Sequence, residues 1–181
     1  MQIFLYARCV VLELVGSDVV HLDKNTFMWF QMSHFAIDVD QDDDEILASL
    51  LGSPAYAHDY ASPFPSASEA FDKTIHGRWV LKAIKIGRFE TTTADRAEVD
   101  LERWANEQDW TDPGYRQPPD VMHRLRAVYS LLGRGELYKL RNPGPEAEHA
   151  SGAVTGTMGF YELIVIDRSS ATLHVIVASD D

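Results

Sequence analysis

The pattern of hydrophobic positions is strongest near the C-terminal end of the chain. Residues 160–166 and 172–178 are two runs of β-branched and aromatic side chains, separated by a short polar segment. Such runs predict the two strands of an antiparallel hairpin. Because both faces of each run are mostly apolar, we expect this hairpin to lie centrally in a sheet that is covered on both sides.

The N-terminal pattern also favours strands. Residues 3–15 are rich in Ile, Val, Leu, Phe and Tyr, and a shorter apolar segment follows at residues 19–22. The Gly-Ser-Asp sequence at residues 16–18 separates the two segments and is typical of a tight turn. The pattern therefore predicts a hairpin between residues 3–15 and 19–22.

Four segments predict helices. Residues 26–37 are apolar on most sides, which is typical of a well-buried helix. Residues 43–51 follow Asp42 and stop at a glycine, and residues 68–76 also end at a glycine. The clearest helix begins at Pro118 and Pro119 and carries an apolar stripe at helical spacing: Val121, Leu125, Val128 and Leu132.

The middle of the chain leaves one assignment open. Residues 79–89 predict a strand, and residues 97–102 alternate apolar and acidic side chains in the manner of a second strand. We prefer a hairpin between them, with a helix over residues 94–104 as the alternative, because apolar residues there also recur at helical spacing. Residues 136–141 predict a further strand.

Two long connections separate these elements. Residues 53–66 carry prolines and aromatic side chains without a regular period, which favours a structured loop over a flexible linker. Residues 142–159 are rich in Pro, Gly and Ala, and their length suggests a lid or a disordered segment. Together the elements predict a single α+β domain over residues 1–181, a mainly antiparallel sheet of about five to seven strands packed with three or four helices.

Charge narrows the range of partners. The chain has 181 residues, 28 of them Asp or Glu against 16 Lys or Arg, which gives a net charge of −12. Nucleic acid and an anionic membrane surface are therefore disfavoured, although less so near the bases between Arg124 and Arg141. Residues 1–75 hold 12 acids and 3 bases, and residues 76–181 hold 16 and 13. The acidic charge is thus concentrated in the N-terminal part.

Other features set expectations about location and cofactors. We expect a cytoplasmic protein, because we find neither a signal-peptide pattern nor an apolar run long enough to span a membrane. The single cysteine, Cys9, excludes an internal disulfide or a cysteine-cluster zinc site. The acidic run 38–45 departs from a calcium loop because Asp43 stands where that loop has glycine, and Ser49 where it has glutamate. We therefore expect no cofactor and no metal site, and we assign no catalytic residue.

One histidine attracts attention because it interrupts an apolar strand. His174 lies in the last predicted strand, and Glu162 interrupts the strand with which it would pair. If the register places both on one face, they form a buried or cleft-side pair. The alternative is a neutral histidine bonded to the backbone or to water.

Two loops with mixed aromatic and polar side chains are the candidate ligand-binding sites. The first contains Tyr56, His58, Asp59 and Tyr60. The second contains Trp104, Asn106, Glu107, Asp109, Trp110 and Asp112. Such loops suit a small-molecule pocket or a protein interface. The alternative is that the aromatic residues only pin long loops onto the core.

Two functional hypotheses follow. The first is a non-catalytic binding or protein-interaction module that uses its acidic part or its aromatic loops to engage a protein partner, a basic one in particular. The second is a small-molecule-binding protein or an enzyme, with a pocket between the loops around His58 and Asp109. The oligomeric state stays open, with a homodimer as one option.

Overall fold

The structure is a computed structural model that describes residues 12–22, 27–60, 73–106, 114–149 and 156–180. Its centre is a six-stranded antiparallel sheet in the order β1-β2-β8-β7-β6-β5, and β3 and β4 form a separate two-stranded hairpin. The fold class is therefore α+β with an antiparallel sheet, as predicted. The strands are β1 (Glu13–His21), β2 (Met28–Ala36), β3 (Ile75–His76), β4 (Trp79–Val80), β5 (Phe89–Thr91), β6 (Glu136–Leu140), β7 (Tyr161–Asp167) and β8 (Thr172–Asp180).

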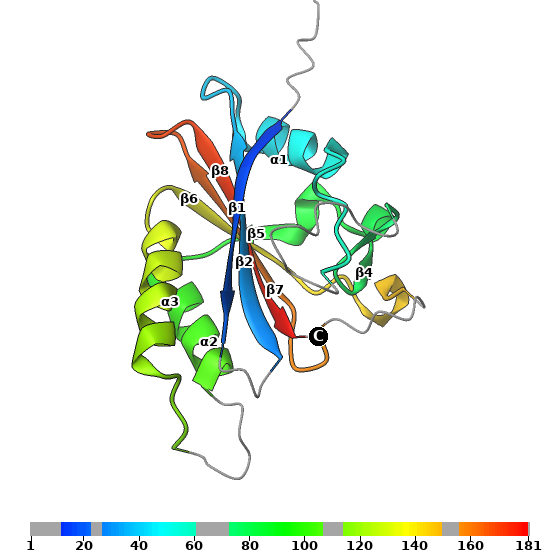
Figure 1. Cartoon of the computed structure of the whole chain (residues 1–181). Coiled ribbons are helices and arrows are strands. Elements are labelled where there is room, and N and C mark those ends of the chain that lie inside the picture. The colour runs from blue at the N-terminus through cyan, green and yellow to red at the C-terminus, as the bar shows by residue number, and fades with distance from the viewer. Residues whose placement is uncertain (1–11, 23–26, 61–72, 107–113, 150–155, 181) are drawn as a thin grey trace, which may run out of the picture.

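Helices cover one face of the sheet, and mainly irregular segments cover the other. The α-helices are α1 (Asp43–Gly52), α2 (Ala94–Asn106) and α3 (Pro119–Leu132), and three short 3₁₀ turns are η1 (Leu81–Ala83), η2 (Ile86–Arg88) and η3 (Pro145–Ala147). Figure 1 shows α2 and α3 together on one side of the sheet, with α1 and the β3-β4 hairpin on the opposite side. We call these two sides the helical face and the loop face.

Each face has its own apolar core. On the helical face, the strands and helices contribute Phe30, Met32, Leu101, Leu125, Val128, Leu163, Val165 and Ile176. On the loop face, the core contains Trp29, Phe35, Ile46, Leu50, Tyr56, Tyr60, Trp79, Ile164, Val175 and Val177. None of the helices in the described residues has the length and hydropathy needed to cross a bilayer.

The C-terminal hairpin confirms the strongest sequence prediction. Strands β7 and β8 pair over their length, from Tyr161 opposite Ala178 to Asp167 opposite Thr172. Strand β2 lies on the other side of β8, and β6 on the other side of β7, so the hairpin is central. Nearly all its side chains are buried, because both faces of the sheet are covered.

The N-terminal predictions were wrong in two places. Residues 16–18 do not form a turn, because β1 continues through them and pairs with β2, with a bulge between Leu14 and Gly16. The predicted helix over residues 26–37 is the strand β2. A strand buried on both faces has the same continuous apolar composition as a buried helix, so composition did not separate the two. Residues 3–11 lie outside the described residues.

The middle of the chain also required correction. The predicted strand over residues 79–89 is divided among β4, η1, η2 and the start of β5, because Val80 pairs in the small hairpin and Phe89 pairs in the main sheet. The predicted hairpin strand at 97–102 belongs to the helix α2, which was the alternative. The predicted helix at 68–76 is wrong at its C-terminal end, where residues 75–76 form β3. Residues 68–72 lie outside the described residues.

Three further elements were predicted correctly. Helix α1 ends at Gly52, as expected, and α3 buries the predicted apolar stripe. Strand β6 occupies residues 136–140. Residues 53–60 form the first part of the predicted irregular loop. Of the long connection at 142–159, the described part contains η3 and a bridge between Glu148 and Trp79.

Candidate functional site

The first predicted loop lies over a buried polar network on the loop face. Glu162 in β7 is at its centre, and the side chains of Glu162 and His76 are both 0% exposed. The Tyr56 hydroxyl donates to Glu162 Oε1 at 2.7 Å, and His76 Nε2 lies 2.8 Å from Glu162 Oε2. The ring of Tyr56 also stacks on that of His76 with centroids 3.9 Å apart. Three segments distant in the sequence therefore meet at one carboxyl group.

The hydrogen-bond partners fix the number of protons in this network. His76 Nδ1 contacts the backbone carbonyl of Tyr56, which only accepts, so Nδ1 carries a proton. The contact between Nε2 and the Glu162 carboxyl group then requires one proton between the two atoms. The pair is either an imidazolium with a carboxylate or a neutral imidazole with a carboxylic acid. Both forms have zero net charge, which is consistent with complete burial.

Gly77 joins this network to neighbouring segments. Its φ of +53° is a left-handed conformation, and a Cβ at this position would lie 2.1 Å from the ring of Phe160. Its N–H donates to the carbonyl of His58 at 2.7 Å, and its carbonyl accepts from His149 Nε2 at 2.8 Å. Glycine at this position lets the backbone approach Phe160 while it holds both histidine-bearing segments.

The two tyrosines of the first loop have strongly perturbed titration. Burial, followed by the nearby Glu162, raises the pKa of Tyr56 well above its usual value, and the same two causes raise the pKa of Tyr60. Tyr60 also stacks on Trp29 in β2, with centroids 5.7 Å apart. Both tyrosines therefore stay protonated and pack the loop against the core. A ligand role for Tyr56 and Tyr60 stays a prediction.

His58 and Asp59 are the partly accessible members of the first loop. Their side chains are 13% and 17% exposed, and His58 Nδ1 lies 4.0 Å from Asp59 Oδ1. His58 Nδ1 accepts a hydrogen bond from the backbone N–H of Tyr60 at 2.9 Å, so this nitrogen carries no proton. His58 Nδ1 is thus engaged in a hydrogen bond within the loop itself. A ligand role for His58 and Asp59 stays a prediction.

The described part of the second predicted loop lies on the opposite side of the sheet. Trp104 packs in the core of the helical face, against Phe30. Asn106 ends α2 and accepts from the backbone N–H of Gln117 at 2.9 Å, which ties α2 to the segment before α3. Glu107, Asp109, Trp110 and Asp112 lie outside the described residues. The described residues of the two loops are not brought together, and the predicted pocket near Asp109 stays a prediction.

His174 does not meet Glu162, as one sequence hypothesis suggested. Glu162 pairs with Val177 and faces the loop face, whereas His174 pairs with Val165 and faces the helical face. His174 instead lies opposite His34 of β2, with 2.7 Å between their Nδ1 atoms. Val165, the partner of His174, lies three positions after Glu162, and an odd separation along a strand places the two side chains on opposite faces.

The contacts of the two histidines explain the titration of His174. His34 Nε2 lies 3.3 Å from Asp18 Oδ2, so Nε2 donates there and His34 Nδ1 accepts from His174 Nδ1. His174 Nε2 is then a buried nitrogen without a partner. Burial and the neighbouring His34 lower the pKa of His174 to about 4. His174 is therefore neutral near pH 7.

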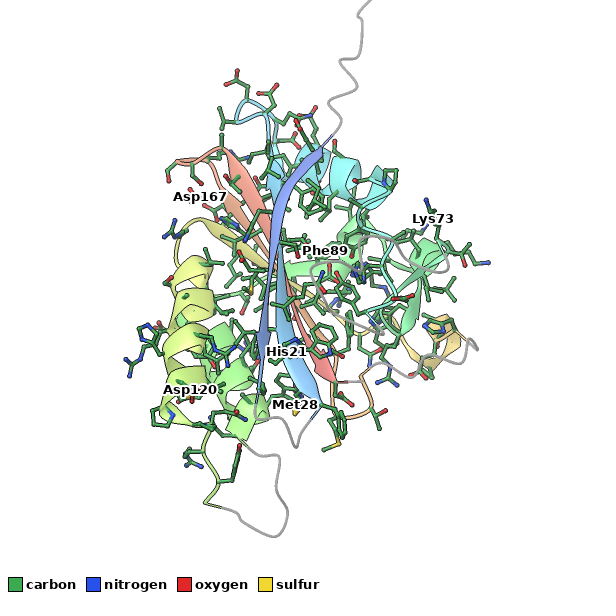
Figure 2. All side chains as sticks on the ribbon, viewed as in Figure 1. His21, Met28, Lys73, Phe89, Asp120 and Asp167 are labelled. Carbon is green, nitrogen blue, oxygen red and sulfur yellow. The ribbon has the colours of Figure 1, made fainter. Side chains whose placement is uncertain are left out.

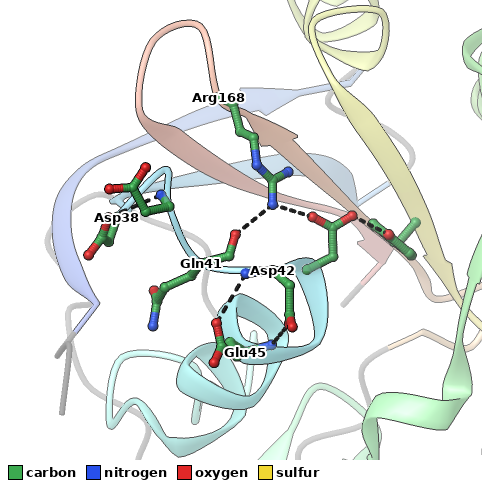
Figure 3. A network of polar contacts seen from close by, with 8 residues as sticks. Asp38, Gln41, Asp42, Glu45 and Arg168 are labelled. Atoms are coloured by element: carbon green, nitrogen blue, oxygen red, sulfur yellow. Dashed lines mark hydrogen bonds and ion pairs between the residues drawn. The ribbon is translucent and has the colours of Figure 1, made fainter. Parts of the chain in front are cut away.

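The acidic run at 38–45 leads into α1 and supplies its N-cap and first turn. Asp42 is the N-cap: its side chain accepts from the backbone N–H of Glu45 at 2.8 Å, and the Glu45 side chain accepts from the N–H of Asp42 at 3.1 Å. This reciprocal pair is a capping box. Arg168, in the β7-β8 turn, pairs with Asp43 at 2.6 Å and donates to the carbonyl of Gln41 at 2.8 Å (Figure 3).

The described side chains do not form a metal centre, and comparisons do not add a family. Among the described residues, no group of three His, Cys, Asp or Glu side chains is placed to hold a metal ion. No family model, no curated protein and no solved structure matches the chain.

Proposed function

We propose that the protein is a cytoplasmic, single-domain, non-catalytic interaction module that binds a basic protein through one end of its sheet. This end, which we call the acidic end, carries exposed carboxylates on β1, on the turn after β2 and at the start of α1: Glu13, Asp40, Asp42, Asp44 and Glu45. They share one end of the sheet because Glu13 pairs with Ala36, after which the chain enters the turn and α1.

Exposed apolar side chains beside these acids carry the proposal. Leu14 and Val15 of β1 are 45% and 59% exposed, and Val39 in the turn is 41% exposed. These three are half of the large exposed apolar residues in the described part of the chain. Apolar side chains gathered on a surface and surrounded by charge are typical of a protein interface.

The backbone of β1 supports the same conclusion. In the described residues β1 pairs only with β2, so its outer side is the edge of the sheet. An edge strand offers unpaired N–H and carbonyl groups to a partner. Arg168, a base at this end, is paired with Asp43, which is not one of these exposed acids. A partner with a positive patch is therefore favoured in both encounter rate and orientation.

Photo-crosslinking from a matched pair of positions tests the proposal. A photoreactive amino acid is placed at Val15 on β1 and, as the control, at Val99 on α2, where the native side chain is 53% exposed. In the source cells, we expect a discrete adduct from position 15 and none from position 99. Mass spectrometry of the adduct identifies the partner, which we expect to have a positive net charge.

Charge variants of the purified pair then test the mechanism. D40K/D44K is expected to weaken binding at least tenfold, whereas E98K/E102K, which reverses two exposed acids of α2, leaves it unchanged. Binding is also expected to weaken as salt concentration rises. Three results contradict the proposal. They are an equal effect of both double variants on binding, equal amounts of adduct from positions 15 and 99, and a dimer of this chain as the only adduct.

A further inference from the structure

A groove of about 1050 Å³ lies at the opposite end of α1 from the acidic end. One wall is formed by the C-terminal half of α1, and the other by the segment that runs from β4 through η1 and η2. Its apolar lining consists of Ala48, Leu51, Val80, Leu81, Ile84 and Ile86. Pockets that hold small organic molecules usually have volumes of about 300–1,000 Å³, so this groove is large enough for one.

Three lysines line the same groove. They are Lys73, Lys82 and Lys85, all exposed, and none of the lining residues that the structure describes is acidic. In the part of the chain that the structure describes, none of the three forms an ion pair. Figure 2 labels Lys73 on this side of the molecule. The groove therefore combines an apolar lining with a local positive charge, although the chain as a whole has a net charge of −12.

We propose that the groove binds a small amphipathic anion, an unbranched aliphatic chain that ends in one carboxylate or phosphate group. The aliphatic wall residues contact the chain and remove it from water, which strengthens binding about fourfold for each methylene buried. The lysine ammonium groups surround the anionic end and donate hydrogen bonds to its oxygens. Charge and lining together distinguish this ligand from a neutral lipid or an amphipathic cation.

This site is independent of the proposed interaction with a basic protein. Helix α1 has ten residues and is therefore about 15 Å long, and the acidic end and the groove lie at its opposite ends. The acids of the capping box do not line the groove. Loss of either function is therefore separable by experiment from loss of the other.

Calorimetry with alkyl probes of one chain length tests the proposal on the full chain. Decanoate and decyl phosphate, each kept below the concentration at which it forms micelles, are expected to bind one molecule per protein. A difference between them identifies the preferred head group. Decyltrimethylammonium is expected not to bind. Shortening the carboxylate from ten to eight carbons is expected to weaken binding about 16-fold, because two fewer methylenes are buried.

Matched variants locate the binding. K82E/K85E is expected to weaken decanoate binding at least tenfold, whereas R96E/R126E, two exposed bases on the helical face, leaves it unchanged. A48W places a large side chain in the groove and is expected to abolish binding, and A127W on the exposed side of α3 is its control. Circular dichroism checks that each variant is folded.

Three results overturn the proposal. One is the absence of heat with both anions. Another is binding of the cation as tight as that of decanoate. The third is decanoate binding that A48W leaves intact, which places the ligand elsewhere on the protein.

Discussion

The two faces of the sheet are covered by different means. On the helical face, α2 and α3 present a row of aliphatic side chains to the strands, and Leu125 and Val128 are fully buried there. On the loop face, α1 and several short irregular segments cover the strands, and a buried carboxyl group, a histidine and a tyrosine are hydrogen-bonded among the apolar residues.

The difference follows from where backbone groups find hydrogen-bond partners. A helix satisfies its own N–H and carbonyl groups, so its buried side needs only apolar side chains. An irregular segment needs partners from elsewhere, and side chains such as His76, which bonds the carbonyl of Tyr56, provide them. We therefore expect the loop face to depend on specific polar partners and the helical face to depend on filled volume.

Removal of Glu162 is expected to have the largest effect. E162A leaves the Tyr56 hydroxyl and His76 without their shared partner in a buried site, so we expect the free energy of unfolding to fall by about 3–5 kcal/mol. Chemical denaturation of the wild type and the variant measures this difference.

The matched variant E162Q shows whether E162A loses stability because hydrogen-bond partners are missing or because the carboxyl group itself is missing. Its amide oxygen accepts from Tyr56, and its NH₂ group donates to Nε2 of a neutral His76, so every polar atom keeps a partner. We expect a loss of about 1 kcal/mol or less. If E162Q is as destabilised as E162A, the network depends on the charge and our count of its partners is wrong.

The helical face is expected to respond to lost volume instead. Leu125 is fully buried in its core, and L125A is expected to cost about 3 kcal/mol in unfolding free energy through the cavity that it leaves. L125M keeps the volume and is expected to cost less than about 1.5 kcal/mol. R126A, at the next and exposed position, is the control and changes stability by less than about 0.5 kcal/mol. Equal losses for L125A and L125M contradict this view of the face.

Elements that depend on residues close together in the chain were the ones that the sequence predicted correctly. The stripe of α3, the capped start of α1 and the β7-β8 hairpin all depend on residues close in the chain, and each was predicted correctly. Strand β2 was mistaken for a helix because both of its faces are buried, which removes the alternation that identifies a strand. In α2, Val99 is exposed whereas Ala97 and Leu101 are buried, and a strand would place all three on one face, so helical spacing was the correct interpretation.

The polar contacts of the loop face were not predicted. Glu162 and His76 are 86 positions apart, and Glu162 and Tyr56 are 106 apart, so no local spacing connects them. Glu162 and His174 were singled out because each interrupts an apolar strand, which is the one signal that the sequence contained. Their actual partners depend on strand register and on which face each side chain occupies, neither of which a pattern of single residues determines.

The pH dependence of stability is expected to show the smallest effect, and it concerns the partly buried pair of His34 and His174. His174 faces His34, with Asp167 raising and Arg134 lowering its proton affinity, and burial is the largest influence on its pKa of about 4. An unfolded histidine titrates near pH 6.5. Between pH 6.5 and 4 the unfolded chain therefore binds more protons at this residue than the folded protein does.

Stability contributed by neutral His174 is thus complete above about pH 6.5 and is lost as the pH falls toward 4. After allowance for screening by solvent, we expect His174 to account for about 1–2 kcal/mol of the total loss over this window. H174Q removes the titrating group, so its unfolding free energy should fall less steeply with decreasing pH than that of the wild type. H123Q, at an exposed position of α3, should retain the wild-type slope. Identical slopes for H174Q and the wild type would show that folding does not perturb this histidine, and that the helical face tolerates its protonation.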